Sequence, residues 1–124
     1  MPWQLCMNPG KLTLTLAVGD LDRSLDFYQK LGFWVVDGGH ISSKFRDTDS
    51  VRWRIVECGE TRLGLFQGVF PTNVLTFHPG NLELTQLNLK RAGIPIKREL
   101  EPDRNSGSIV LEDPDGNLIL FNRR

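Results

Sequence analysis

The sequence has few cysteines and histidines, no long apolar run and no excess of charge of either sign. Its 124 residues include two cysteines and two histidines, and 15 basic residues balance 15 acidic residues. Balanced charge creates no field that would recruit nucleic acid or an anionic membrane, and no stretch approaches the ~20 apolar residues of a membrane span. Two cysteines are too few for a disulfide framework. We therefore expect a cytoplasmic protein that binds neither nucleic acid nor membrane.

What the sequence does contain is an internal repeat. Three features of the first half recur in the second half at one offset of 61 positions (81−20, 82−21 and 93−32). Each set consists of a polar residue able to cap a helix, the first apolar residue of that helix, and a glycine able to end it. The matched pairs are Asp20 with Asn81, Leu21 with Leu82, and Gly32 with Gly93. The repeat indicates two copies of one supersecondary unit.

Alternation of apolar and polar residues predicts the elements of each copy. In the first copy we expect strands at Leu12–Val18, Phe33–Val36, Val51–Glu57 and Leu63–Gln67, and a helix after Asp20. In the second copy we expect strands at Val74–His78, Ile94–Leu100, Ile109–Leu111 and Leu118–Asn122, and a helix from Asn81 to Ala92. Each copy is then βαβββ, which predicts the α+β class. We expect one domain over residues 1–124, with modules at about 11–68 and 73–122 and an N-terminal arm at 1–10.

Two motifs resemble those of a known family. The first is DLDRSLDFY at residues 20–28, followed by Leu31, Gly32 and Phe33, and the second is DPDGN at residues 113–117. In this order around a repeat, they resemble the vicinal oxygen chelate superfamily, which includes glyoxalases, bleomycin-resistance proteins and extradiol dioxygenases. The resemblance implies two βαβββ modules in a cup-shaped mixed sheet around a ligand cavity, with the helices on the outer face. It also implies a bacterial homodimer.

The resemblance also indicates where a divalent metal would be bound. Metal-dependent relatives take one ligand from the first strand and one from the last strand of each module. The corresponding positions here are Thr13, Val74, Gly64 (or Phe66 if the register slips by two) and Leu120. These residue types do not supply the His, Glu or Gln side chains that such a metal needs. We therefore expect no metal and no cofactor, which argues against glyoxalase I and extradiol dioxygenase chemistry.

The sheet face opposite the helices is the expected ligand pocket. Its predicted lining is mixed, with apolar side chains and a few hydrogen-bonding groups, which suits a small organic ligand. We expect Gly64 to enlarge this pocket, because relatives carry a bulky ligand side chain there. The residues assigned to the pocket are Thr13, Thr15, Trp53, Arg62, Gly64, Phe66, Thr76, His78, Leu120 and Asn122.

The strand at residues 51–57 leaves two alternatives open. If its other face turns inward, Arg52 and Arg54 bind an anion in the cavity. Otherwise Trp53 belongs to the core and both arginines are solvated.

Three functions remain in competition. The first is a metal-free small-molecule binding protein, with sequestration or resistance as one version; the absence of an acidic cluster argues against a cationic drug as its ligand. The second is a glyoxalase-like lyase, isomerase or dioxygenase with an atypical site, in which His78 is the weak catalytic candidate because its side chain titrates near neutral pH. The third is a scaffold whose cavity is filled by side chains.

Overall fold

The computed structural model describes residues 8–101 and 107–123 of the chain. Residue contacts divide it into two compact units. The first unit comprises Thr13–Val74, and the second unit comprises the described residues after Val74 together with residues 8–12. Most of the expected N-terminal arm, residues 1–7, lies outside the described residues.

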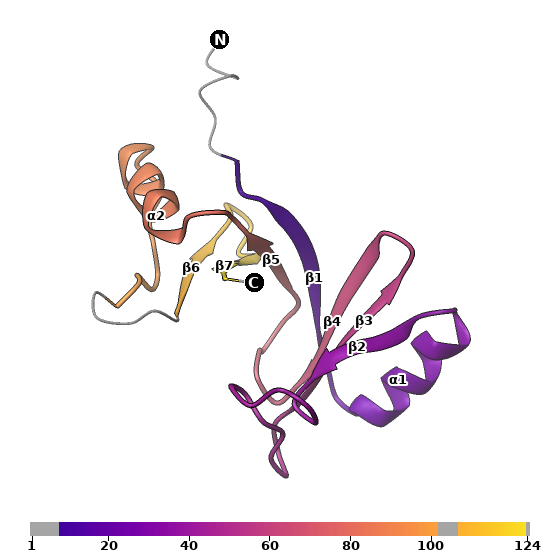
Figure 1. The fold of residues 1–124 in the computed structure, drawn as a ribbon. Helices are drawn as coiled ribbons and strands as arrows, with labels where there is room; N and C mark the ends of the chain where they lie inside the picture. The colour runs from indigo at the N-terminus through magenta and orange to yellow at the C-terminus, as the bar shows by residue number, and fades with distance from the viewer. Residues whose placement is uncertain (1–7, 102–106, 124) are drawn as a thin grey trace. The chain divides into compact units, whose positions relative to one another are not determined.

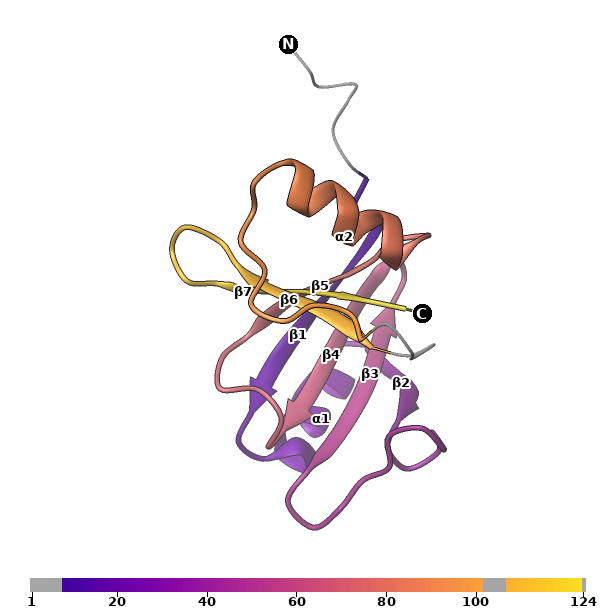
Figure 2. The same cartoon turned by 90° about the vertical axis from the view of Figure 1, so that its left-hand side faces the viewer.

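The first unit is a four-stranded mixed sheet with one helix. Its elements are β1 (Lys11–Val18, whose first two residues count with the second unit), α1 (Leu21–Lys30), β2 (Trp34–Gly38), β3 (Arg52–Cys58) and β4 (Thr61–Gln67). The strand order is β2-β3-β4-β1, with β1 and β4 parallel and the other pairs antiparallel. Figure 2 shows these strands side by side, with α1 behind them. This unit has the expected βαβββ order.

The core of the first unit lies between α1 and one face of its sheet. Leu21 of α1, Val56 of β3 and Leu65 of β4 are completely buried there. Apolar residues from β1, β2 and the rest of α1 pack around them. Because side chains alternate along a strand, the residues between these positions lie on the opposite face of the sheet.

The second unit has a smaller sheet. Its elements are β5 (Val74–His78, whose first residue counts with the first unit), α2 (Leu82–Arg91), β6 (Ser108–Glu112) and β7 (Leu118–Asn122). The strands lie in the order β5-β7-β6 (Figure 1). The α2 residues Leu82 and Leu89 pack against Ile109, Leu111 and Phe121. The α+β class is thereby confirmed.

The repeat is visible at both ends of the helices. Asp20 and Asn81 share one extended backbone conformation, and the side chain of each accepts a hydrogen bond from the backbone N–H three residues later. At the other end, Gly32 and Gly93 have positive φ angles of 108° and 74°. The residue after each glycine donates its backbone N–H to a carbonyl of the last turn, from Phe33 to Tyr28 and from Ile94 to Leu89, both at 3.0 Å. These bonds form the same helix-ending motif in both units.

The segment Ile94–Leu100 differs from its prediction, because a single bridge between Arg98 and Val110 replaces the expected strand. Pro95 lies 61 positions after Trp34, the first residue of β2 (95−34). Proline holds φ near −65°, away from the value of an antiparallel strand, and has no N–H to donate. The N–H of Leu100 bonds to the side chain of Gln86 in α2, at 2.7 Å, instead of to a neighbouring strand.

None of the helices in the described part of the chain is both long enough and apolar enough to cross a membrane.

Candidate functional site

The face of the first sheet opposite α1 gathers six of the ten predicted pocket residues. Strand register places Thr15 beside Gly64, and Trp53 beside Phe66. Thr13 and Thr15 are each 3% exposed and Trp53 is 8% exposed. The six residues on this face are Thr13, Thr15, Trp53, Arg62, Gly64 and Phe66. The predicted pocket lining of this unit is therefore contiguous.

Four aromatic rings form a continuous row, which we call the aromatic row, along one end of this face. The rings of Phe45 and Trp53 are stacked with centroids 5.8 Å apart, and those of Trp53 and Phe66 are stacked at 5.3 Å. Phe70 extends the row from Phe66 at 5.6 Å with a tilted ring. Phe45 is 41% exposed, so one end of the row is accessible to solvent. Offset rings at these separations attract one another beyond the effect of burial alone.

Gly64 does not open a large space on this face. A Cβ atom at residue 64 would lie 3.0 Å from Cε1 of Phe66 and 3.2 Å from Oγ1 of Thr15. The ring of Phe66 therefore occupies part of the room that the missing side chain leaves. The glycine allows close packing of Phe66 against the strand, in contrast to the enlarged pocket expected from the sequence.

Arg62 lies at the end of the face away from the aromatic row. Its guanidinium forms an ion pair with Glu57, its direct neighbour across the β3–β4 pair. The pair brings one positive and one negative charge to the face, and its net charge is zero.

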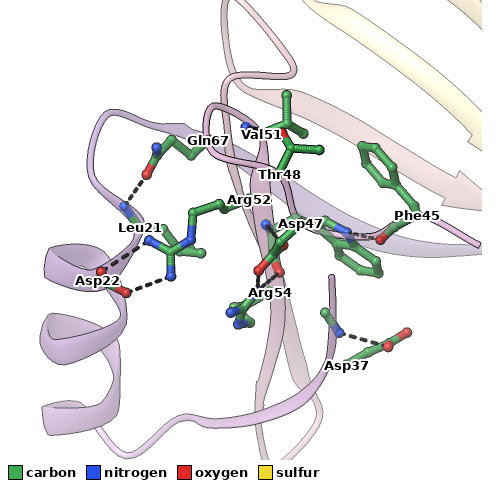
Figure 3. Close-up of polar contacts among 12 residues, drawn as sticks. Leu21, Asp22, Asp37, Phe45, Asp47, Thr48, Val51, Arg52, Arg54 and Gln67 are labelled. Atoms are coloured by element: carbon green, nitrogen blue, oxygen red, sulfur yellow. Dashed lines mark hydrogen bonds and ion pairs between the residues drawn. The ribbon is translucent and has the colours of Figure 1, made fainter. Parts of the chain in front are cut away.

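Trp53 is one of the buried core residues, as the second alternative expects, but Arg52 and Arg54 follow neither alternative. Trp53 lies on the face opposite α1, whereas Arg52 reaches α1 and forms two hydrogen bonds of 3.0 and 3.1 Å with Asp22 (Figure 3). Arg54 is 9% exposed and donates to Asp47 at 2.7 Å. Because each arginine already has a carboxylate partner, neither is a solvated cation or a vacant anion site. The bonds from Arg52 hold the pKa of Asp22 below its ordinary value.

The second unit holds the other four predicted pocket residues on the face opposite α2. Phe77 and Phe121 stack in the core beneath α2 with centroids 5.7 Å apart, so their neighbours along each strand face away from the helix. Leu120 and Asn122 pair with Val110 and Ser108 of β6. The four residues on this face are Thr76, His78, Leu120 and Asn122.

The four positions that the resemblance indicates do not fit a divalent metal. These positions carry one hydroxyl, that of Thr13, and three side chains without a donor atom, those of Gly64, Val74 and Leu120. Within residues 8–101 and 107–123, no three His, Cys, Asp or Glu side chains lie close enough together to hold a metal ion. Imidazole, carboxylate and thiolate groups are the usual ligands of a catalytic divalent metal.

Sequence reasoning predicted a polar loop after Gly39 but missed the contacts by which this loop completes the aromatic row. Residues 39–51, which we call the 39–51 loop, supply Phe45 and also Asp47, the partner of Arg54. Phe70 was missed because it follows β4 in a segment without strand periodicity. The adjacent pair Gly38 and Gly39 was the available signal, because two glycines before a polar loop indicate a close backbone approach.

The family model of the Glyoxalase/Bleomycin resistance protein/Dioxygenase superfamily matches residues 12–121. The chain belongs to this superfamily. No protein of curated function matches the sequence.

Solved structures of low sequence identity share the fold. One is a glyoxalase/bleomycin resistance protein/dioxygenase superfamily member from Vibrio splendidus 12B01, with 17% identity over 92% of this chain and 98% of that chain, and a TM-score of 0.66. Another is a methylmalonyl-CoA epimerase from Mycobacterium tuberculosis, with 16% identity over 95% and 92% of the two chains and a TM-score of 0.64. A catechol 2,3-dioxygenase has 27% identity over 90% of this chain and 38% of that chain, with a TM-score of 0.56.

Proposed function

We propose that this protein binds a small organic molecule on the sheet face of the first unit opposite α1, without a divalent metal. The observation that carries the proposal is the composition of this face. It combines stacked rings, two threonine hydroxyls and one neutral ion pair, whereas the superfamily's metal positions carry no strong ligand. Apolar walls with a few placed polar groups are typical of small-molecule sites.

The chemistry of the face favours binding over catalysis. The half-exposed ring of Phe45 and the partly buried rings of Phe66 and Phe70 offer ring surface, and Thr13 and Thr15 bring two hydroxyl groups to the same face. None of these groups is a general base near neutral pH. A protein of this kind would sequester its ligand, as a resistance protein does.

The test is to purify the protein without chelator, and to measure its metal content by elemental analysis and its bound molecules by native mass spectrometry. We expect less than stoichiometric zinc, nickel, manganese or iron, and an organic adduct that Trp53→Ala removes. Stoichiometric metal that His78→Ala or His40→Ala removes would overturn the proposal.

We also propose that the protein is a homodimer, as the resemblance implies. Several large apolar side chains of the first unit are more than half exposed, including Leu31 at 58%, Trp34 at 53% and Ile41 at 61%. Burial of such side chains in a subunit interface is favourable. Light scattering coupled to gel filtration should give twice the monomer mass of 14.1 kDa, and a monomer that persists at high concentration would contradict the dimer.

The likeness to catechol 2,3-dioxygenase supports a second candidate, because its identity of 27% exceeds that of the other structures compared. In this candidate the chain is a glyoxalase-like lyase, isomerase or dioxygenase whose atypical site uses His78. The dioxygenase arm is tested by oxygen uptake with catechol after loading with ferrous iron. Uptake that His78→Ala abolishes would support this candidate, and its absence in the wild-type protein would exclude catechol dioxygenase activity.

A further inference from the structure

Asp47 fastens the 39–51 loop to β3 through both of its carboxylate oxygens. One carboxylate oxygen of Asp47 accepts a hydrogen bond from Arg54 at 2.7 Å, and the other accepts one from the backbone N–H of Trp53 at 3.2 Å. The backbone N–H of Asp47 donates to the carbonyl of Gly39 at 3.0 Å. Asp47 therefore ties the start of the loop, its own turn and the adjacent strand together. Figure 3 shows its carboxylate bonded to Arg54. Charge-assisted bonds of this kind are stronger than neutral ones.

Two adjacent glycines, Gly38 at the end of β2 and Gly39 at the start of the loop, make room for this contact. A Cβ atom on Gly39 would lie 2.0 Å from Oδ1 of Asp47, and one on Gly38 would lie 2.6 Å from Cδ of Arg54. Neither glycine has a positive φ angle. Close approach of the Asp47–Arg54 pair to the backbone, rather than an unusual backbone conformation, accounts for both glycines.

The loop fixed in this way carries Phe45 to the aromatic row. The carbonyl of Phe45 accepts a hydrogen bond from Nε1 of Trp53 at 2.7 Å, and its ring stacks on the indole with an interplanar angle of 19°. Two contacts therefore join this loop to Trp53. The Asp47 carboxylate accepts a bond from the Trp53 backbone N–H, and Phe45 contacts the Trp53 indole. A binding surface held in place before the ligand arrives avoids the entropic cost of ordering it.

We propose that Asp47 is a positioning residue: it fastens the 39–51 loop to β3 and so holds Phe45 against Trp53 as a preformed flat wall that selects planar, unsaturated ligand groups. The selectivity rests on the proposed function, whereas the fastening of the loop does not. The two parts therefore have separate tests.

Trp53 fluorescence tests the fastening without any ligand. The substitutions Trp3→Phe and Trp34→Phe leave Trp53 as the only tryptophan of the three. In that background, we expect Asp47→Asn and Gly39→Ala to shift the Trp53 emission to longer wavelength and to increase its quenching by acrylamide. Asp22→Asn is the control for charge, because Asp22 binds the other arginine of β3. Gly19→Ala is the control for the glycine, because a Cβ atom there would meet nothing within 4 Å.

Unchanged Trp53 emission and quenching in a folded Asp47→Asn protein would overturn the positioning role. Circular dichroism establishes that each variant is folded. Gly39→Ala keeps the aspartate and its charge, so an effect of both variants identifies the contact itself and not the loss of a carboxylate.

Calorimetric titration with 2-naphthoate and with its saturated analogue decahydro-2-naphthoate tests selectivity at constant charge. One aromatic contact corresponds to a preference of about two- to tenfold for the planar ligand. Phe45→Leu and Asp47→Asn should each abolish this preference, and Asp22→Asn should retain it. Equal binding of the two compounds by the wild-type protein would overturn the selectivity and leave the proposed function standing. Binding of neither compound would also overturn it, while the proposed function is decided separately by native mass spectrometry.

Discussion

The first unit continues from its helix into the edge strand β2, whereas the second unit continues from its helix into an irregular segment. Both helices begin at the same kind of cap and end at the same glycine motif, with equivalent hydrogen bonds. The two units diverge two residues after that glycine, because Trp34 begins β2 whereas Pro95 begins no strand. The same capping residue types and the same glycine thus give each unit a helix with equivalent ends. The proline at residue 95 then changes the conformation of the segment that follows.

The two units also differ on the sheet face opposite their helices. In the first unit, that face carries the aromatic row. In the described part of the second unit, the aromatic pair Phe77 and Phe121 lies on the other face, in the core beneath α2. Among the described residues, the aromatic row is thus a feature of the first unit.

The largest change in the free energy of unfolding is expected from substitutions in the last strand of each unit. Leu65 and Phe121 are core residues of β4 and β7. We expect Leu65→Ala and Phe121→Ala to lower the free energy of unfolding by about 2–5 kcal/mol each, through loss of buried contacts and the cavity left behind. Urea denaturation measures both. Leu84→Ala is the control because Leu84 is half exposed, and an equal loss from the control would contradict this account of the cores.

The next largest loss of stability is expected from the Asp47–Arg54 ion pair of the 39–51 loop. The described ion pairs of the second unit are all more exposed than this one. The Asp47 side chain is 20% exposed and that of Arg54 is 11% exposed. Asp47→Ala leaves Arg54 without its carboxylate and should lower the free energy of unfolding by about 2 kcal/mol. Asp22→Ala, at an exposed pair, should lower it much less. Equal losses in the two variants would indicate that burial does not distinguish these pairs.

The pH dependence of stability should report the same aspartate. Burial by itself would raise the pKa of Asp47, but the bonds from Arg54 and the Trp53 N–H leave that pKa below its ordinary value of 3.8. The folded protein therefore binds this proton less readily than the unfolded chain does. The stabilisation is fully present above pH 3.8 and is lost as the pH falls through the lower folded pKa. Thermal unfolding from pH 7 downward should show a smaller acid loss for Asp47→Asn than for the wild-type protein, and parallel curves would contradict this.

The helix caps test the likeness of the two units directly. Asp20→Ala and Asn81→Ala each remove a side-chain acceptor from one backbone N–H at a helix start. Each should cost about 1 kcal/mol in the free energy of unfolding, measured by urea denaturation. Asp20→Asn and Asn81→Asp keep the acceptor and should be nearly neutral. A cost confined to one unit would break the equivalence.

The smallest effect is expected from Pro95→Val, which tests the difference between the units. Valine restores an N–H and favours extended backbone, so the segment after α2 should pair further along β6. The free energy of unfolding should change by less than about 1 kcal/mol. Hydrogen exchange provides the measurement: the amides of Ile96 and Glu112 should become more protected. Unchanged protection would show that Pro95 does not prevent the strand.

Most of the fold could be predicted from local patterns in the sequence. Apolar alternation located β1, β3, β4, β5 and β7, and the capping residues Asp20 and Asn81 located both helices. These signals depend on neighbours in the sequence, which is why they are readable without a structure. The prediction of a strand at Ile94–Leu100 was wrong, because Pro95 not only ends the helix but also disfavours a strand after it.

The candidate site was less predictable because its contacts join distant positions. Strand alternation predicted that Thr15 and Gly64 lie on the same face of the sheet, although it did not predict that they are direct neighbours. In contrast, the contacts of Phe45 with Trp53 and of Asp47 with Arg54 bring a loop back to a strand, and no periodicity marks a loop. Gly64 was misjudged for a related reason, since the position of the Phe66 ring depends on side-chain packing.

The central claim is that the first unit binds an organic molecule without a metal. Anomalous X-ray scattering from crystals of chelator-free protein, with the residual density beside Trp53, tests it most directly. The account predicts organic density against Trp53 and Phe66, and no anomalous peak of a transition metal near Thr13, Gly64 or Leu120. An anomalous peak at those positions, or one bound to His78, would contradict it.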